Sequence, residues 1–473
     1  MTNKQTKDFE SGHAIVIGGS LSGLLVARVL SDHFERVMLL ERDHFPALSE
    51  HRRGVPQGRH AHGLLASGFM AIKRLFPSLE DELIRAGAVP GDVVGDMRWY
   101  QYGGCKAKFN SGLSGLVLSR PLLESAIRRR VVGQPNVQAL EGCNVQGLIA
   151  SPDRRRVCGV RLARRACGGE EALTAELVVD TSGRGSQLPI WLETLGYDRP
   201  AQDTIKIGVG YASRVYRRRP GELDGDIGVI INPKPPEEKR LGGMLAMEGD
   251  RWMVTLGGWL GDHAPTDEQG YLAFARSLPA ADIYDIIKYA EPLSDIAVYK
   301  FPSNLRRRYE RLARFPEGCL VTGDALCSFN PIYGQGMSVA ALEAVALQDC
   351  LNEHYWTAGS TELPRRFFKR AAQVIDIPWK LAASADFNYP EVKGRRPMGT
   401  GLVNRYVSKV HQVATRDRKV CRAFFDVANL LNLRVPRFRL SGEPQELVAC
   451  GVEAVAEESL EYRAGIGVCE KFR

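Results

Sequence analysis

The N-terminal segment 13–42 constrains the fold more than any other part of the sequence. "HAIVIGG" (13–19) is a short apolar run that ends on glycine, which is typical of a buried parallel strand. "LSGLLVARVL" (21–30) has apolar residues at helical spacing, and "RVMLLER" (36–42) is a second apolar run. A strand, a tight turn, a helix and a second strand in so short a span predict a βαβ unit.

The turn in this unit, "GGSLSG" (18–23), occupies the place of the dinucleotide-binding G-x-G-x-x-G turn. Ser20 stands where the second glycine is usual, and Gly23 allows the helix to pack close to its strand. The start of the helix offers free N–H groups and a positive dipole end to a phosphate. Glu41, at the end of the second strand, can accept hydrogen bonds from a ribose hydroxyl. We therefore predict a dinucleotide-binding site.

Two later stretches indicate which dinucleotide is bound. "LVVDTSGRGS" (177–186) and "LVTGDALCSFNPIYGQGM" (320–337) each join an apolar strand to a glycine-rich turn. In the second, Asp324 can meet a polyol such as a ribityl chain, and Pro331 fixes a loop whose glycines allow a flat ring to approach. The helix from Met337 would direct its N-terminus at the ring edge where negative charge collects when a flavin is reduced.

The bulk composition excludes several classes of protein. Hydrophobic residues make up 44% and charged residues 25%, ordinary values for a globular chain. The net charge of +8 is mild for 473 residues, and the arginine clusters at 128–130, 217–219 and 306–308 are predicted to be solvated surface rather than a nucleic-acid groove. The longest apolar stretch is interrupted by glycine, serine and Arg28, so no membrane span is expected.

Cysteine usage and the N-terminus indicate the compartment. The ten cysteines form no C-x-x-C pair and no zinc-like cluster, so reduced thiols and no metal site are expected. The N-terminus is polar and carries acids, unlike a secretory signal. These features predict a cytoplasmic protein.

The residue pattern of the chain changes between about residues 204 and 300. Strand-like segments follow one another there, separated by turn signals, which predicts an antiparallel sheet. The fold class is therefore α/β, with a Rossmann-like FAD-binding domain, an inserted antiparallel β-sheet substrate domain and a helical C-terminal region. The predicted bounds are 12–98, 118–192 and 300–355 for the FAD-binding domain, 99–117 and 193–299 for the substrate-binding sheet, and 356–473 for the C-terminal region.

With these stretches placed, the chain resembles FAD-dependent monooxygenases of the p-hydroxybenzoate hydroxylase fold. "IGGSLSG", "LLERD", "RRGVPQGRHAHGLL", "LSRPLLESAIRRRV", "VVDTSGRGSQLPIWLETLGY" and "TGDALCSFNPIYGQGMSVAALEA" carry the resemblance, which covers about residues 12 to 435. The resemblance is strongest to the branch of bacterial polyether epoxidases and related natural-product oxygenases, and more distant to squalene epoxidases.

The resemblance implies FAD, NAD(P)H as a transient reductant without a Rossmann domain of its own, and O2. In this chemistry the reduced flavin forms a C4a-hydroperoxide, which would epoxidise or hydroxylate a large apolar natural-product intermediate. The cofactor-binding residues expected from the turns and the resemblance are Gly18, Gly19, Ser20, Ser22, Gly23, Glu41, Arg42, Arg53, Gln57, Arg120, Val145, Asp180, Gly323, Asp324, Pro331, Gly334, Gln335, Gly336 and Met337. The turn at Asp180 departs from the family pattern by reading Asp-Thr-Ser-Gly.

The remaining site residues stay open. His60 and His62 are candidates for a base, with packing or hydrogen bonding near the flavin as the alternative, so no catalytic residue is assigned. Large apolar side chains could face the substrate or simply fill the core: Trp99, Tyr102, Phe109, Met244, Met247, Trp252, Leu256 and Trp259.

Several other functions share this cofactor. A flavin halogenase would show the motif W-x-W-x-I-P. The segment "DIPWK" (376–380) matches it only in part and in the wrong order. A prenyl or alkene reductase would saturate double bonds with the same flavin. A non-redox cyclase would keep FAD as a wall of its pocket. A plain FAD-binding redox partner is disfavoured by the antiparallel domain, and the oligomeric state is left open.

Overall fold

The framework of the computed structural model is a five-stranded sheet in which every neighbouring pair is parallel. The structure describes residues 12–164, 169–354, 362–431, 439–440 and 447–448. In sheet order the strands are β17 (Cys319–Val321), β11 (Leu177–Asp180), β1 (His13–Ile17), β2 (Arg36–Leu40) and β7 (Val137–Leu140). β1, β11 and β17 are buried throughout, as expected for a parallel sheet covered on both faces.

The register of this sheet positions the site. Ile17 lies opposite both Leu40 and Asp180, and Asp180 lies opposite Val321. Because the carboxyl ends of parallel strands meet at the same edge, the turns after β1, β2, β11 and β17 lie side by side although they are far apart in the sequence. The predicted βαβ unit is confirmed.

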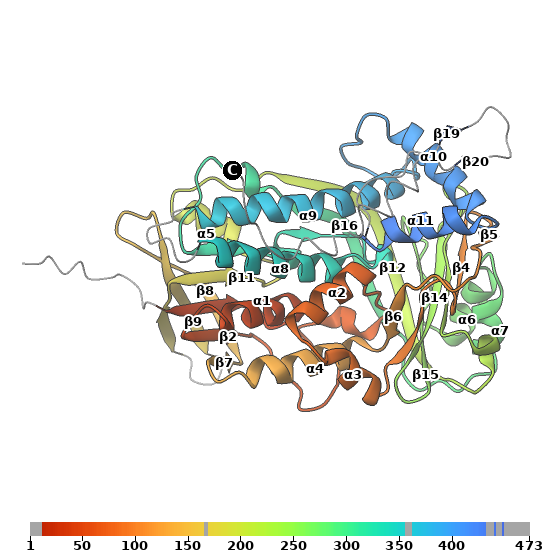
Figure 1. Cartoon of the computed structure of the whole chain (residues 1–473), viewed down its shortest axis with the longest axis horizontal. Coiled ribbons are helices and arrows are strands. Elements are labelled where there is room, and N and C mark those ends of the chain that lie inside the picture. Colours follow the sequence, from red (N-terminus) through yellow and green to blue (C-terminus); the bar gives the residue numbers. More distant parts are fainter. Residues whose placement is uncertain (1–11, 165–168, 355–361, 432–438, 441–446, 449–473) are drawn as a thin grey trace, which may run out of the picture.

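Helices cover the sheet and one another. They are α1 (Leu21–Ser31), α2 (Ala66–Leu75), α3 (Leu79–Arg85), α4 (Arg120–Val132), α5 (Leu188–Thr194), α8 (Gly336–His354) and α9 (Leu363–Asp386). Figure 1 shows α1, α2, α8 and α9 stacked beside one another, and α8 contacts each of the other three. α1 is buried on almost every side because it lies between the sheet and α8.

A second, eight-stranded sheet forms the other half of the molecule (Figure 1). In sheet order its strands are β18 (Cys327–Ser328), β16 (Ala297–Arg307), β12 (Gln202–Arg217), β15 (Arg251–Gly258), β14 (Arg240–Met247), β13 (Gly228–Ile231), β4 (Met97–Gln101) and β5 (Gly104–Cys105). All neighbours are antiparallel except β13 and β4. The predicted α/β class with an antiparallel sheet is therefore confirmed.

Short elements complete the fold. α6 (Glu268–Arg276) and α7 (Asp282–Ile287) pack against β15 and β14. The smaller sheets are β8 (Cys143–Ala150) with β9 (Val157–Arg164) and β10 (Glu170–Thr174), β3 (Val89–Asp92) with β6 (Ser114–Val117), and β19 (Arg439–Leu440) with β20 (Leu447–Val448). The 3-10 turns are η1 (Pro56–Arg59), η2 (Glu222–Gly225), η3 (Tyr309–Arg311), η4 (Gly323–Ala325) and η5 (Pro331–Tyr333).

The described part of the C-terminal region is mostly helical, with two short strands. α10 (Thr400–Val413) and α11 (Arg418–Ala428) follow α9, while the rest of 432–473, apart from β19 and β20, lies outside the described residues. The predicted boundary at residue 300 falls inside β16, and the division into domains stays a prediction. Among the described helices, none is both long enough and apolar enough to cross a membrane.

The prediction of solvated surface at 306–308 is wrong. The first two arginines of this cluster are 2% and 6% exposed at the end of β16. Arg306 forms an ion pair with Asp376 on α9. Arg307 donates to the carbonyl oxygens of Ala325 and Arg184 at 2.8 Å each. The guanidinium fork suits this bridging, because it can donate several hydrogen bonds at once. In the cluster at 128–130 the first arginine is buried as well.

Candidate functional site

One cavity of about 460 Å³ lies where the carboxyl ends of the parallel strands meet. This volume is in the range of small-molecule and cofactor sites. Its wall combines the starts of α1, α4 and α8, the end of β2, and the turns after β11 and β17. The predicted cofactor residues that line it are Gly18, Ser20, Ser22, Glu41, Arg42, Gln57, Arg120, Val145, Gly323, Asp324, Pro331, Gly334, Gly336 and Met337.

The other predicted cofactor residues do not line this cavity: Gly19, Gly23, Arg53, Asp180 and Gln335. Arg53 is exposed, and its neighbour Arg52 is the arginine that is buried beside the turn. Asp180 is fully buried, and its carboxylate accepts hydrogen bonds from the N–H of Ser182 and the hydroxyl of Ser186. Burial raises the pKa of Asp180, which braces its own turn instead of facing the cavity.

Gly23 permits the close approach of α1 to the strand ends. A Cβ at this position would lie 1.8 Å from the carbonyl oxygen of Gly18 and 2.8 Å from Oγ1 of Thr181. The Thr181 hydroxyl is shared between the carbonyls of Ile17 and Gly18, at 2.8 and 2.9 Å, which fixes the two turns together. Any side chain at Gly23 would push the helix away from the cavity.

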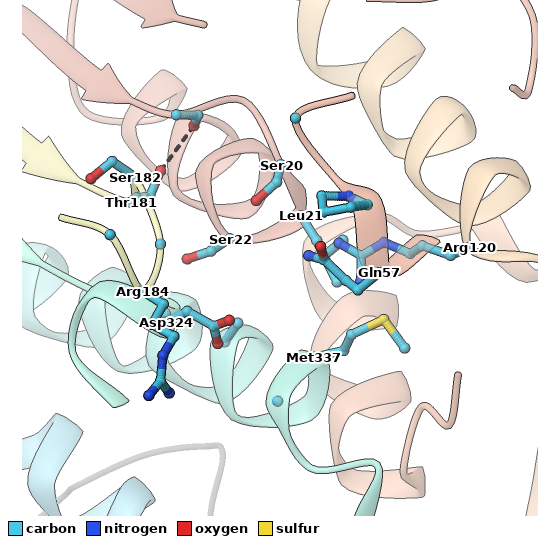
Figure 2. A pocket seen from close by; sticks show the side chains of 18 of the residues that line it. Ser20, Leu21, Ser22, Gln57, Arg120, Thr181, Ser182, Arg184, Asp324 and Met337 are labelled. Carbon is cyan, nitrogen blue, oxygen red and sulfur yellow. Dashed lines mark hydrogen bonds between the residues drawn. The ribbon is translucent and has the colours of Figure 1, made fainter. Parts of the chain in front are cut away.

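The first turn of α1 carries groups without a partner. Ser20 is the N-cap residue, but its side chain makes no capping hydrogen bond. Ser22 lines the cavity, and its buried Oγ has no partner among the described residues (Figure 2). The first N–H groups of a helix also lack intrahelical acceptors. This end of the cavity therefore offers several donors to an anion.

Asp324, in the turn after β17, lines the same cavity. Figure 2 shows its carboxylate beside Arg184, near the start of α1. The surrounding protein raises the pKa of Asp324, while the guanidinium groups of Arg184 and Arg120 oppose that shift. The carboxylate is still accessible through the open cavity and accepts no hydrogen bond from the described residues. It is free to accept hydrogen bonds from ligand hydroxyl groups.

The start of α8 forms the far end of the cavity. The helix begins at Gly336, one residue before the predicted start at Met337, and both residues line the cavity. Gly334 adopts φ +64° in the loop before it, where a Cβ would contact the backbone of Gly63 at 3.5 Å. Gln335 is buried, and its Oε1 has no partner among the described residues.

A buried network of charged side chains supports the opposite end. Oε2 of Glu41 accepts from the N–H of Gly19 at 2.8 Å and pairs with Arg52 at 3.1 Å. Arg52 also pairs with Glu124 at 3.0 Å, and Glu124 pairs with Arg120 at 3.0 Å. Oε1 of Glu41 accepts a single hydrogen bond, from the N–H of Asp43 at 2.9 Å, and can accept a further one, so the predicted ribose contact stays available. The network joins β2 to α4 behind the cavity.

Arg184 is a cavity residue that the sequence interpretation missed. Its guanidinium donates to Ser303 at 2.7 Å and Ser328 at 3.3 Å, and lies 5.0 Å from the ring centre of Phe301. Burial lowers the pKa of Arg184, and Asp324 opposes that shift. The only sequence signal was a cation within the glycine-rich turn "DTSGRGS".

Glu343 is a second missed residue, and it lies behind the cavity wall on α8. Its side chain is fully buried, and Oε2 accepts hydrogen bonds from the Thr322 hydroxyl and from the N–H of Gly323. Burial, with a further contribution from Asp324, raises its pKa to about 7. An acid within the apolar helix "VAALEAVAL" was the available signal. Glu343 holds the turn that presents Asp324.

Asp386, at the end of α9, connects the loop before α8 to the second sheet through hydrogen bonds. Its fully buried carboxylate accepts four hydrogen bonds, from Asn304 Nδ2 at 2.7 Å, Asn330 Nδ2 at 2.8 Å, the Tyr333 hydroxyl at 2.9 Å and Trp259 Nε1 at 3.1 Å. Burial raises the pKa of Asp386, while these donors oppose the shift. Because two donors belong to the loop 330–336, the carboxylate fixes that loop against the sheet.

The two candidate histidines are held as neutral side chains. His60 Nδ1 lies 2.8 Å from Ser213 Oγ, and His62 Nδ1 donates to the carbonyl of His60 at 2.9 Å. Burial, with smaller contributions from neighbouring histidines and arginines, lowers the pKa of His60 to about 3 and that of His62 to about 4. A general base works best when its pKa is near the operating pH. These positions favour packing and hydrogen bonding over base catalysis.

None of the large apolar residues considered from the sequence lines the cavity. Met244, Trp252 and Leu256 lie in the core between the second sheet and α6–α7, and Trp99 and Phe109 pack near α11. Core packing therefore accounts for these five residues. The aromatic residues that do line the cavity are Tyr211, Tyr299, Phe301, Phe329 and Trp191.

Comparison with known proteins places the chain in a family. No family model matches the sequence. Protein Rv3254 of Mycobacterium tuberculosis (strain ATCC 25618 / H37Rv) is 35% identical over 389 residues, which cover 80% of this chain and 80% of that protein. The chain belongs to the family of Protein Rv3254.

Solved structures show the same fold at low sequence identity. p-Nitrophenol 4-monooxygenase PnpA from Pseudomonas putida DLL-E4 superposes with a TM-score of 0.64 at 19% identity, over 89% of this chain and 98% of that one. The flavin-dependent brominase Bmp2 superposes with a TM-score of 0.61 at 14% identity, over 96% and 100% of the two chains. The chain therefore has the fold of FAD-dependent monooxygenases and halogenases, as the resemblance predicted.

Proposed function

We propose that this chain is an FAD-dependent monooxygenase that transfers one oxygen atom from O2 to an apolar small molecule. The observation that carries the proposal is one cavity in which the starts of α1 and α8 meet Asp324. A dinucleotide turn alone would suit many cofactors. A second helix start and an accessible carboxylate in the same cavity suit the ring and the polyol chain of a flavin.

The residues of the cavity fit FAD. The first turn of α1, with the partnerless Ser22 hydroxyl, would hold the pyrophosphate. Glu41 and Val145 would receive the adenosine half, and Asp324 the ribityl hydroxyls. Gly334 and the start of α8 would receive the flavin ring, with the positive helix end near its N1–C2=O edge. When bound and reduced by NAD(P)H, FAD would supply the activated oxygen.

The chain's own groups would orient the substrate and keep water out. Tyr211, Tyr299, Phe301 and Phe329 give the cavity an aromatic wall, which suits an apolar or ring-containing substrate. His62 lines the wall as a neutral side chain, and it is assigned no proton transfer. Water must be excluded from the cavity, because its entry would release the activated oxygen as hydrogen peroxide before it reaches the substrate.

The finer proposal is epoxidation or hydroxylation of a large natural-product intermediate, as in the polyether epoxidase branch. It rests on the sequence resemblance and on the aromatic wall. A reductase, a non-redox cyclase and a halogenase are the alternatives. The sequence lacks the W-x-W-x-I-P motif, and its partial echo at 376–380 lies within α9, in the helix that ends at Asp386.

The cofactor is tested first, by FAD titration of the purified chain and of Asp324→Asn. A charge-assisted hydrogen bond contributes about 1.5–3 kcal/mol, so the variant should bind FAD at least about tenfold more weakly. The matched control is Asp198→Asn, since Asp198 is exposed and does not line the cavity. Equal FAD affinity in Asp324→Asn and the parent would show that the flavin half is misplaced.

The reaction class is tested by product mass with NAD(P)H present and absent. Gain of one oxygen atom with NAD(P)H consumption supports the monooxygenase. Gain of two hydrogens would show the reductase, and unchanged mass without NAD(P)H would show the cyclase. A product carrying bromine or chlorine when halide is supplied would show the halogenase.

A further inference from the structure

Residues 392–416 form a basic segment with no aspartate or glutamate. Its cationic side chains are Lys393, Arg395, Arg396, Arg405, Lys409 and Arg416, and all six are exposed. Within the described part of the chain none of them forms an ion pair, whereas many other surface arginines do. This short segment supplies most of the net charge of +8.

Exposed apolar side chains stand within the same segment. Met398 is 101% exposed, Leu402 75% and Val403 48%. Met398 precedes α10, and the other two lie in its first turn. Single exposed apolar residues are normal on a protein surface, but three within six positions among unpaired cations are not.

The segment is held firmly by the rest of the fold. The N–H of Lys206 on β12 donates to the carbonyl of Lys393 at 2.7 Å. The guanidinium of Arg396 donates to the carbonyl of Phe387 at 3.0 Å and lies 5.2 Å from the centre of its ring. On the inner face of α10, Val410 is buried against α11 and neighbouring residues. The apolar side chains are therefore presented outward from a packed base.

We propose that the basic–apolar segment 392–416 docks the protein on an anionic lipid surface. Exposed apolar side chains that insert among lipid tails, surrounded by cations that meet anionic headgroups, are the pattern of interfacial helices. The attraction of each Lys or Arg to an anionic membrane surface adds to the binding strength. Figure 1 shows α10 at the periphery of the molecule, at the end of the second sheet. Docking here is peripheral and requires no membrane-spanning helix.

The test is co-sedimentation of the full-length protein with vesicles of phosphatidylcholine alone or with one-third phosphatidylglycerol. Binding is expected only to the anionic vesicles, and it should weaken as salt is added. Two double variants test the two parts of the segment: Met398→Ser with Leu402→Ser, and Arg395→Gln with Arg405→Gln, two exposed arginines that do not hold the segment to the fold. Each should lower vesicle affinity by about tenfold or more.

Matched controls come from exposed residues elsewhere. Met70→Ser replaces a methionine that is 62% exposed on α2, and Arg154→Gln with Arg155→Gln replaces two adjacent exposed arginines. Both should leave vesicle binding unchanged, and circular dichroism should confirm that every variant is folded. Absence of binding, equal binding to neutral vesicles, or equal losses in test and control variants would each overturn the proposal. FAD content has no bearing on these outcomes.

Discussion

Replacing Glu343 by glutamine is expected to stabilise the protein above neutral pH. The Glu343 carboxyl is fully buried, and its Oε1 has no partner among the described residues. Burial raises its pKa from 4.5 to about 7, with the Asp324 charge adding to the shift. Glutamine keeps one oxygen for the Thr322 and Gly323 donors, and its amide replaces only the partnerless oxygen.

Proton linkage gives the sign and the size of the effect of Glu343 on the free energy of unfolding. Because the folded-state pKa of Glu343 lies above its unfolded value, the folded chain binds more protons between the two values, and stability falls as the pH rises through that range. The loss of unfolding free energy caused by ionising the buried Glu343 is absent below pH 4.5 and complete above about pH 7. At about 1.4 kcal/mol per pKa unit it amounts to about 3 kcal/mol. Glu343→Gln should recover that amount at pH 8 and little of it at pH 4.5.

The assay is thermal unfolding of parent, Glu343→Gln and a control at acid and alkaline pH. An unfolding entropy of about 2.1 cal/mol/K per residue makes 3 kcal/mol equal to about 3 °C for a chain of this length that unfolds as one unit. The control is Glu353→Gln, an exposed acid on the same helix. A lower midpoint for Glu343→Gln at pH 8, or the same difference at both pH values, would show that the ionised Glu343 does not destabilise the fold.

Three further substitutions test other parts of the structure. Asp386→Ala leaves four donors, three of them buried, without their acceptor, and should lower the unfolding free energy by about 3 kcal/mol or more in guanidinium titrations. Gly23→Ala places a Cβ 1.8 Å from a backbone oxygen, so the purified variant should contain less FAD than the parent. Lys106 is buried, and burial lowers its pKa from 10.5 to about 8. Its charge therefore destabilises the fold below pH 8, and Lys106→Met should raise the midpoint at pH 7 but not at pH 11.

The parts of the fold that the sequence predicted depend on local patterns. The apolar runs at 13–17 and 177–180 are short and nearly all apolar, because both faces of the parallel sheet are covered. Gly23 could be assigned from its spacing, since the requirement for close packing repeats in every such turn. Asp324 could be placed because it follows a strand and precedes a helix.

The missed features depend on contacts between distant segments. Nothing local distinguishes Arg52, which is buried against Glu124, from the exposed Arg53 beside it. Asp386 receives its donors from two other parts of the chain, so its role emerges only when these meet. The cluster at 306–308 is hydrophilic by composition but buried because partners on neighbouring segments satisfy it. Its burial followed from tertiary structure and could not be read from composition.

Isotopically labelled O2 would show whether the protein transfers oxygen from O2 to its substrate. The reconstituted protein would be supplied with FAD, NAD(P)H, labelled O2 and candidate apolar substrates, and the product examined by mass spectrometry. A monooxygenase should give one labelled oxygen atom in the product and NAD(P)H consumption that depends on the substrate. A product whose new oxygen comes from unlabelled water, or a product formed without NAD(P)H, would contradict oxygen transfer from O2.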